Sequence, residues 1–464
     1  MCLPFRGHAK RYDGLLSRFY RAGVDWAPSY EFITPPVHFL LRTITENPSL
    51  SMSIKSLGFT GWIKSVYHNA PGTLWKAGSE PELTGSELNA MKHLVRTTKL
   101  PEEKLWFSAL GKGDVNAFVA LLLSQLTELR RLHLGPDYYK ENEFLHLLLS
   151  RALCPRDPTS ELPMFLHLEH VCISPAAEGK QLGKSYNYKS DIYYLLHLPA
   201  VRTLDVELAL ERVVEDFQFS WFHSKPLTTS NLTALALRTH KIPDVAVLQA
   251  ILAATPNLRT LHYEFGGFFD TNFVGYNPAT DIREVNFDFG KFSHALRHIQ
   301  KTLKKLKFVV SVLDLFMPFD EEPPWEWKIR KASFRDLSML EDLTIPFVGY
   351  FGCGSHLTES PLEIWSGLPR SIRHLRFTEG LGEASAFLWC PERCLDLLET
   401  SLQDWKSFTP DLQCLDIELK KDTVKRWTQR NPGWQEELGL ICERAKLSCN
   451  IEYERLTKNI YYVQ

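Results

Sequence analysis

The sequence predicts an α/β fold in which short parallel strands alternate with helices around one continuous core. The first observation is a recurring pattern: an aliphatic residue, two variable residues, a second aliphatic, one variable residue and a third apolar residue. Its clearest copy is Leu129-x-x-Leu132-x-Leu134. The second observation is that segments with helical periodicity stand between many of the copies. The third is that the last two apolar positions lie two residues apart, which places both side chains on one side of a strand.

Copies of this pattern recur at uneven spacing along the chain. By their three apolar positions they are Ile54-Leu57-Phe59, Leu129-Leu132-Leu134, Leu168-Val171-Ile173, Val201-Leu204-Val206, Leu232-Leu235-Leu237, Leu258-Leu261-Tyr263, Ile282-Val285-Phe287, Leu303-Leu306-Phe308, Leu340-Leu343-Ile345, Ile372-Leu375-Phe377 and Leu412-Leu415-Ile417. One copy is too short to bury anything alone. If each strand pairs in parallel with the next, the apolar residues stack into one core and the helices cover it. We therefore expect the strands at Leu204, Leu235, Leu261 and Val285 to be parallel neighbours.

The segments around these copies carry ordinary helix signals. Pro35-Pro36 begins a helix with an apolar face that includes Phe39, and Asn47-Pro48 ends it. A helical pattern lies near Leu88–Leu94, and Asp114 stands at the cap position of the apolar segment DVNAFVALLLSQL. Further segments of helical character are EFLHLLLSRAL, DIYYLLHL, DVAVLQAILAAT, FSHALRHIQ and CLDLLETSLQDW.

The expected organisation is a repeat region between two caps. Residues 1–49 form an N-terminal helical cap, and residues 50–420 form an irregular solenoid in which residues 61–112 are an insertion or an atypical repeat. Residues 421–464 form a C-terminal cap, in which an amphipathic helix is followed by the strand-like SCNIEYE. End caps are needed because a repeat unit at the end of a stack would otherwise expose its apolar face.

On these residues the chain resembles the leucine-rich-repeat proteins over roughly residues 50–420. The resemblance implies a horseshoe-shaped solenoid with a parallel sheet on the concave face and helices on the convex face. The segment HFLLRTITENPSLSMSIKSLGF is similar to the segment that follows the F-box in fungal F-box/leucine-rich-repeat proteins. That family implies substrate recognition for a ubiquitin ligase. The F-box itself is not found in residues 1–34, where Leu3-Pro4 is followed by Phe5-Arg6-Gly7.

Composition argues against several classes of partner. The net charge is −2, so there is no global basic field to recruit nucleic acid or an anionic membrane. We find no apolar run long enough to cross a bilayer and no apolar core of a signal peptide at the N-terminus. The nine cysteines have no framework spacing, so we expect reduced thiols in the cytoplasm or nucleus.

Motifs for catalysis, cofactors and metals are weak in this chain. Asp288-Phe289-Gly290 matches a metal-binding triplet of kinases, but no glycine-rich loop or catalytic-loop motif accompanies it. The cysteines lack the close paired spacing of a zinc site. We therefore expect a non-enzymatic protein that binds a protein partner, without cofactor or metal. An enzyme of unrecognised class is the alternative, and a pocket with a strongly perturbed acid–base pair would favour it.

The variable residues of the repeated pattern are the candidate binding residues. They point away from the core and line the concave face of the expected solenoid. The candidates are Arg131, His133, His170, Asp205, Arg238, His262, Glu264, Glu284, Asp288, Lys305, Lys307, His374, Arg376 and Asp416. Among them, an acidic block of Glu264, Glu284 and Asp288 stands beside the basic pair Lys305 and Lys307.

A second candidate is the loop FDEEPPWEW, in which Trp325 and Trp327 could dock a partner, because aromatic residues anchor interfaces. The partner is a protein that the sequence does not identify. A Skp-type adaptor is expected only if an F-box lies upstream of this chain.

Overall fold

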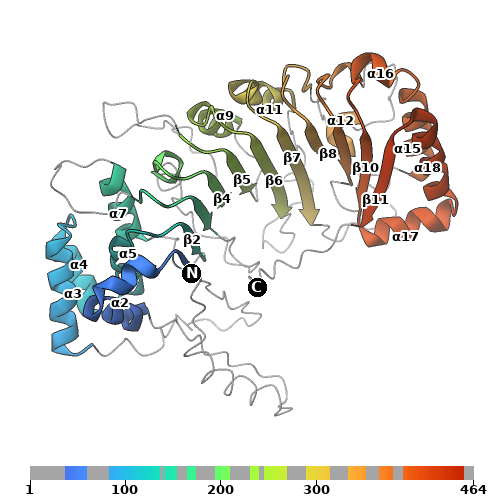
Figure 1. Ribbon diagram of the computed structural model, residues 1–464. Coiled ribbons are helices and arrows are strands. Elements are labelled where there is room, and N and C mark those ends of the chain that lie inside the picture. The colour runs from blue at the N-terminus through green and yellow to red at the C-terminus, as the bar shows by residue number, and fades with distance from the viewer. Residues whose placement is uncertain are drawn as a thin grey trace, which may run out of the picture. The chain divides into compact units, whose positions relative to one another are not determined.

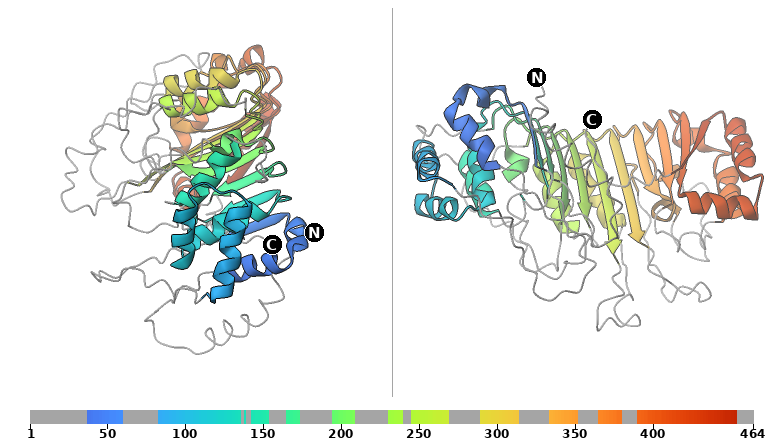
Figure 2. Two further views of the ribbon diagram at one scale, coloured as in Figure 1. Left: turned by 90° about the vertical axis from the view of Figure 1, so that its left-hand side faces the viewer. Right: turned by 90° about the horizontal axis from the view of Figure 1, so that it is seen from below.

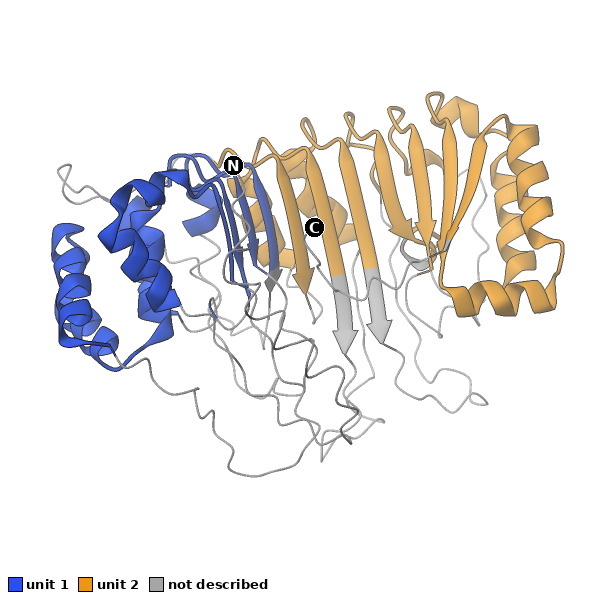
Figure 3. Cartoon of the chain, turned by 60° about the horizontal axis from the view of Figure 1, so that its bottom comes forward, with its two compact units in different colours: residues 1–206 blue, residues 207–464 orange. Residues whose placement is uncertain are grey.

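A computed structural model describes residues 37–59, 83–135, 138, 142–153, 165–173, 194–208, 230–239, 245–268, 289–313, 333–351, 365–379 and 390–453. The chain divides into two compact units, residues 1–206 and 207–464 (Figure 3). Within the described residues, eleven strands form one parallel sheet, and their order in the sheet is their order in the chain (Figure 1). The predicted α/β fold with a parallel sheet is confirmed.

Unit 1 contains helices and the first strands. Its described elements are α2 (Val37–Glu46), η1 (Pro48–Ser53), β1 (Ser56–Phe59), α3 (Gly85–Thr97), α4 (Glu103–Gly111), α5 (Val115–Gln125), β2 (Arg131–Leu134), α7 (Glu143–Leu153), β3 (His170–Ile173) and β4 (Thr203–Leu208), whose last residues belong to unit 2. Helix α5 packs against α2 and α7. Asp114 caps α5 as predicted, because its Oδ1 accepts a hydrogen bond from the Asn116 amide at 2.8 Å.

Unit 2 carries the remaining strands. Its described elements are β5 (Ala234–Thr239), α9 (Val245–Ala254), β6 (Thr260–Phe268), α11 (Phe289–Leu296), η2 (Arg297–Ile299), β7 (Lys305–Leu313), β8 (Asp342–Pro346), α12 (Phe347–Phe351), β9 (His374–Thr378), α15 (Pro391–Ser401), α16 (Trp405–Phe408), β10 (Cys414–Leu419), α17 (Lys421–Arg430), α18 (Trp434–Ala445) and β11 (Ser448–Tyr453). Figure 2 shows the strands of this unit side by side in chain order. The strand-like SCNIEYE is confirmed as β11, which pairs in parallel with β10.

The apolar positions of the repeated pattern form the core on one side of the sheet. In unit 2 a single register row joins the second positions across β5 to β10, and each of these side chains is at most 2% exposed. This row consists of Leu235, Leu261, Leu306, Leu343, Leu375 and Leu415. In unit 1 the corresponding row contains Leu132, Val171 and Leu204, which are also buried. The alternation in the sequence therefore predicts correctly which strand residues face the core.

Aromatic side chains join the helices to this buried side of the sheet. Phe292 of α11 packs against Tyr263 of β6 and Phe308 of β7, with ring centroids 5.6 and 4.9 Å apart. Phe347 of α12 stacks on Phe377 of β9 at 5.2 Å. Helices α11 and α12 therefore cover the apolar side of the strands in unit 2, and the opposite side of these strands is the one that carries polar residues.

One predicted strand neighbour is wrong. We expected the strand after Leu261 to be the copy at Ile282-Val285-Phe287, but β6 pairs directly with β7, so Leu261 is aligned with Leu306. The copy itself lies outside the described residues. The pattern of three apolar residues is a property of local sequence, whereas backbone pairing between segments decides which strands are neighbours.

Phe39 also departs from the expected face of its helix. The residues of α2 that are buried are Val37, Leu41 and Ile44, whereas Phe39 is 48% exposed. The Arg42 guanidinium lies 5.1 Å from the centroid of its ring. Phe39 falls outside the helical stripe that the three buried residues define, so it contacts a cation at the surface instead of the core.

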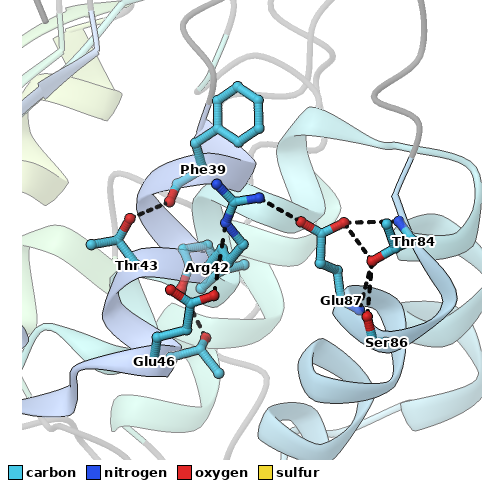
Figure 4. Close-up of polar contacts among 9 residues, drawn as sticks. Phe39, Arg42, Thr43, Glu46, Thr84, Ser86 and Glu87 are labelled. Atoms are coloured by element: carbon cyan, nitrogen blue, oxygen red, sulfur yellow. Dashed lines mark hydrogen bonds and ion pairs between the residues drawn. The ribbon is translucent and has the colours of Figure 1, made fainter.

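Helix α3 is joined to α2 by an ion pair at a capped N-terminus (Figure 4). The Thr84 hydroxyl accepts a hydrogen bond from the Glu87 amide at 3.3 Å, and the Glu87 carboxylate accepts one from the Thr84 amide at 2.8 Å. This reciprocal pair is a capping box. Arg42 of α2 donates to the same Glu87 carboxylate at 2.8 Å. The hydrogen bonds from the Thr84 amide, Arg42 and the Thr84 hydroxyl lower the pKa of Glu87 to about 2.

This shift predicts a stability difference that depends on pH. Because the pKa of Glu87 is lower in the folded chain than its ordinary 4.5, its stabilising effect is fully present above pH 4.5 and is lost as pH falls toward about 2. The Glu87→Gln variant should therefore unfold at a lower temperature than the parent at neutral pH. This difference in unfolding temperature should disappear on acidification. Thermal unfolding followed by circular dichroism measures this. Glu46→Gln is the matched control, since Glu46 contacts Arg42 at 3.9 Å from outside the capping box. An equal and equally pH-dependent loss in both variants would contradict the assignment.

In the part of the chain that the structure describes, no helix combines the length and the apolar character needed to cross a membrane.

Candidate functional site

The candidate site is the side of the unit 2 strands that faces away from the core, here called the polar face. Its strand residues alternate with those that face the core, as the strand geometry requires. Within the described residues its polar and charged members are Arg238, Thr260, His262, Glu264, Lys305, Lys307, Asp342, Thr344, His374, Arg376, Thr378, Cys414, Asp416, Glu418, Ser448, Asn450 and Glu452.

Strand register arranges these side chains in rows that cross the strands. One row runs from β6 to β11 through Thr260, Lys305, Asp342, His374, Cys414 and Ser448. The adjacent row runs through His262, Lys307, Thr344, Arg376, Asp416 and Asn450. Neighbouring strands lie about 4.8 Å apart, so consecutive members of a row are within reach of one another or of one ligand.

Arg376 of β9 is the centre of a charged cluster at the β10–β11 end of the polar face. Its Nη2 lies 3.1 Å from Asp416 Oδ2 and 2.8 Å from Glu452 Oε1, and its Nη1 lies 3.7 Å from Glu418 Oε2. One guanidinium therefore serves three carboxylates from two strands. Burial by itself lowers the pKa of Arg376, but the hydrogen bond that Arg376 donates to Asp416 and the surrounding carboxylates raise it overall. The cluster has more negative than positive charge.

Asp416 is held ionised inside this cluster. It is 8% exposed, and its Oδ1 accepts hydrogen bonds from Asn450 Nδ2 at 3.0 Å and from the Cys414 thiol at 3.0 Å. Burial raises the pKa of Asp416, but these hydrogen bonds and the contact with Arg376 outweigh it and lower the pKa. Burial raises the pKa of the Cys414 thiol, and the hydrogen bond to Asp416 raises it further, so that thiol stays protonated.

The β5–β8 end of the polar face carries a weak positive charge. Arg238 Nε lies 3.5 Å from Glu264 Oε2, and Lys305 Nζ lies 2.6 Å from Asp342 Oδ2. Lys307 is exposed, and within the described residues no carboxylate lies within ion-pair distance of it. Burial, Lys307 and Arg238 lower the pKa of His262 to about 4, so this imidazole is neutral at pH 7. Its Nε2 is buried and makes no hydrogen bond to the described residues.

The unit 1 strands carry the remaining described candidates. Arg131 of β2 is aligned with His170 of β3, and His133 is aligned with Cys172, which in turn is aligned with Asp205 of β4. Burial lowers the pKa of His133, and the Asp205 carboxylate offsets part of that effect. The structure therefore brings Arg131, His133, His170 and Asp205 onto one side of the strands of unit 1.

The polar residues thus lie on the side of the strands that we predicted, although some of the predicted residues are not among the described ones. Arg238, His262, Glu264, Lys305, Lys307, His374, Arg376 and Asp416 lie on the polar face of unit 2. Glu284, Asp288, Trp325 and Trp327 lie outside the described residues. Because β6 and β7 are neighbours, Glu264 lies on the strand next to the one that carries Lys305 and Lys307, with no strand at Val285 between them.

Sequence reasoning missed the contribution of β11. Asn450 and Glu452 come from the segment we expected to be only a cap, yet both contact the Arg376–Asp416 pair. The alternation in SCNIEYE could have shown which of its residues join the polar face, because Ser448, Asn450 and Glu452 are two residues apart.

Neither a scan against known protein-family models nor a search of the curated proteins finds a significant match to this chain. Within the described residues, no cluster of His, Cys, Asp and Glu side chains has an arrangement suited to a metal ion.

Proposed function

We propose that the protein is a non-enzymatic interaction scaffold that holds a protein partner on the polar face of unit 2. The observation that carries this proposal is the ordered placement of charged side chains in two register rows on one side of the sheet. The other side of the same strands is covered by α11 and α12, so the polar face is the side on which a partner could reach many strands at once.

The exposed charges of this face support a binding role. Lys307 is exposed and makes no ion pair with another described residue. A partner that supplied a carboxylate there would gain an interaction without displacing an existing one. Arg376, by contrast, is already bound to three carboxylates, so it contributes to the shape and charge of the face more than to direct contact.

A finer form of the proposal is that the sheet and helices make an irregular leucine-rich-repeat solenoid that recognises substrates for an F-box type ubiquitin ligase. It is supported by strands that follow one another in chain order with aligned leucines, and by the resemblance of the segment at residues 38–59 to the fungal family. Co-purification of the full-length gene product with a Skp-type adaptor tests this finer form. A full-length product that bound its partner without any adaptor would contradict the ligase role but not the scaffold role.

Site-specific photo-crosslinking tests the scaffold. Thr344 lies in the middle of the polar face between Lys307 and Arg376 in the register row, and it is half-buried. A photoreactive phenylalanine at Thr344 should give a discrete protein adduct in cells. The same group at Lys425, which is exposed on α17, should not. Adding Lys307→Glu should reduce the Thr344 adduct about fivefold, because a like charge then faces the partner's carboxylate.

Two outcomes of the crosslinking experiment would contradict the proposal. Equal adducts at Thr344 and Lys425, or no adduct at Thr344 under conditions in which the chain is folded, would place the partner elsewhere. The Lys425→Glu variant controls for net charge, since it makes the same charge change as Lys307→Glu outside the polar face.

A further inference from the structure

The charges of the polar face are separated along the direction that crosses the strands. Strands β5 to β8 carry three cations and two carboxylates there, a formal charge of +1: Arg238, Lys305 and Lys307 against Glu264 and Asp342. Strands β9 to β11 carry one cation and three carboxylates, a formal charge of −2: Arg376 against Asp416, Glu418 and Glu452. The face therefore has a weakly basic end and an acidic end within one unit.

Each end has charge that the other described residues do not neutralise. At the basic end, Lys305 is bound to Asp342 and Arg238 to Glu264, which leaves Lys307 as the cation without an ion pair among the described residues. At the acidic end, Glu418 and Glu452 share one guanidinium with the buried Asp416, and Glu452 is 48% exposed. A ligand could therefore supply an anion at one end and a cation at the other.

The occupant must cross the strands by side-chain contacts. The backbone groups of β6 to β10 are used in pairing with the strands on both sides, so a segment lying on the face cannot add to the sheet there. Recognition then depends on where the charges of the segment lie. Lys307 on β7 and Glu452 on β11 are separated by four strand spacings across the sheet and two residues along the strands, or about 20 Å. An extended chain covers that distance in about five or six residues.

We propose that the polar face binds an extended segment of a partner protein that carries an acidic group at one end and a basic group about five or six residues away. The acidic group lies over Lys307 and the basic group over Glu418 and Glu452. This inference rests on the proposed function and deepens it, because it states the charge pattern of the partner. A uniformly acidic or uniformly basic segment meets repulsion at one end of the face.

Defined peptides test the pattern on the purified full chain. The segregated probe is a fluorescent peptide with a run of aspartates, a Gly/Ser spacer of about five residues and a run of arginines. The others are a peptide of the same composition with alternating charges, an all-acidic peptide and an all-basic peptide. Fluorescence anisotropy at low salt should show that the segregated peptide binds about fivefold more tightly than the alternating one, a gap that high salt removes.

Charge-reversal variants should change the preferred peptide. Lys307→Glu makes both ends of the face acidic, so the all-basic peptide should become the tightest ligand. Glu452→Lys neutralises the acidic end, so binding of the all-acidic peptide should gain about threefold or more over the parent. Glu452→Gln is the milder variant and should move binding in the same direction by less. Lys425→Glu should leave the ranking unchanged.

Three results would overturn this inference: equal affinity for the segregated and alternating peptides, the same ranking in every variant, or no measurable binding of any peptide. These results do not by themselves remove the proposed function. If the Thr344 crosslink persists and still depends on Lys307, the face binds a partner of another charge pattern. If that crosslink is also absent, the proposed function fails with the inference.

Discussion

Phe308→Ala is expected to lower the free energy of unfolding of unit 2 by about 3–5 kcal/mol, because a large buried side chain is replaced by a cavity. Phe308 is fully buried on β7. Its ring lies 4.9 Å from that of Phe292 and 5.7 Å from that of Tyr263, so it joins α11 to two neighbouring strands. The loss combines the apolar surface returned to water and the aromatic contacts that disappear.

Chemical denaturation measures this loss, and amide hydrogen exchange of β6 and β7 shows that it arises there. The matched control is Lys307→Ala, one residue earlier on the same strand but on the polar face, where the side chain is exposed. Its effect should stay within about 0.5 kcal/mol, as for most surface substitutions. Equal losses at the two positions would contradict the assignment of the core side and the polar side of β7.

Glu379→Ala is the second large expected effect, because Glu379 caps a helix from a different part of the chain. The carboxylate is 5% exposed and accepts hydrogen bonds from the Lys420 amide at 3.0 Å and the Thr423 hydroxyl at 2.7 Å. Lys420 is the N-cap of α17 and has no capping side chain of its own. Removing the carboxylate leaves a helix N–H and a buried hydroxyl without their acceptor, which should cost about 1–3 kcal/mol.

Glu379→Gln separates the role of the acceptor from the role of the charge. Burial raises the pKa of Glu379 above its ordinary 4.5, although the hydrogen bonds from Thr423 and Lys420 offset part of the rise. The folded chain then binds this proton more tightly than the unfolded chain, so the contribution to stability is greatest below pH 4.5 and is lost as pH rises through the folded pKa. As the pH rises through the folded pKa, the free energy of unfolding of Glu379→Gln should therefore increase relative to that of the parent.

Urea denaturation across a pH series checks both variants. Glu379→Ala should be less stable than the parent throughout, and Glu379→Gln should be less destabilised, because its amide oxygen still accepts a hydrogen bond. A Glu379→Gln variant that lost relative stability with rising pH would show that the carboxylate is more stable charged than neutral in this site. The hydrogen bonds from Lys420 and Thr423 would then outweigh the free-energy cost of burying the charged carboxylate.

Local pattern was sufficient to predict most of the elements and their buried sides. Leu132 and Leu134 are buried on β2 because alternation along a strand depends only on neighbouring residues. The segment EFLHLLLSRAL coincides with α7, and Asp114 caps α5, because periodicity and capping are also properties of short segments. The same reasoning placed Lys307 and Arg376 on the side opposite the core.

Pairing between distant segments could not be read in this way. The copy at Ile282-Val285-Phe287 satisfies the same local pattern as its neighbours, yet β7 occupies the position beside β6. Glu452 contacts Arg376 from 76 residues away along the chain, and Glu379 caps α17 from 41 residues before it. No periodicity links such residues, because strand register and inter-segment hydrogen bonds bring them together.

The sequence alone therefore determined that this protein alternates strands and helices, which strand residues are buried and which side of the strands is polar. These follow from the side-chain geometry of a single helix or strand. Only the tertiary structure decided which strands are neighbours, how the charges are distributed across the polar face and that β11 completes its acidic end. These depend on backbone hydrogen bonds between segments far apart in the chain, and those bonds set the register that turns separate variable residues into one charged surface.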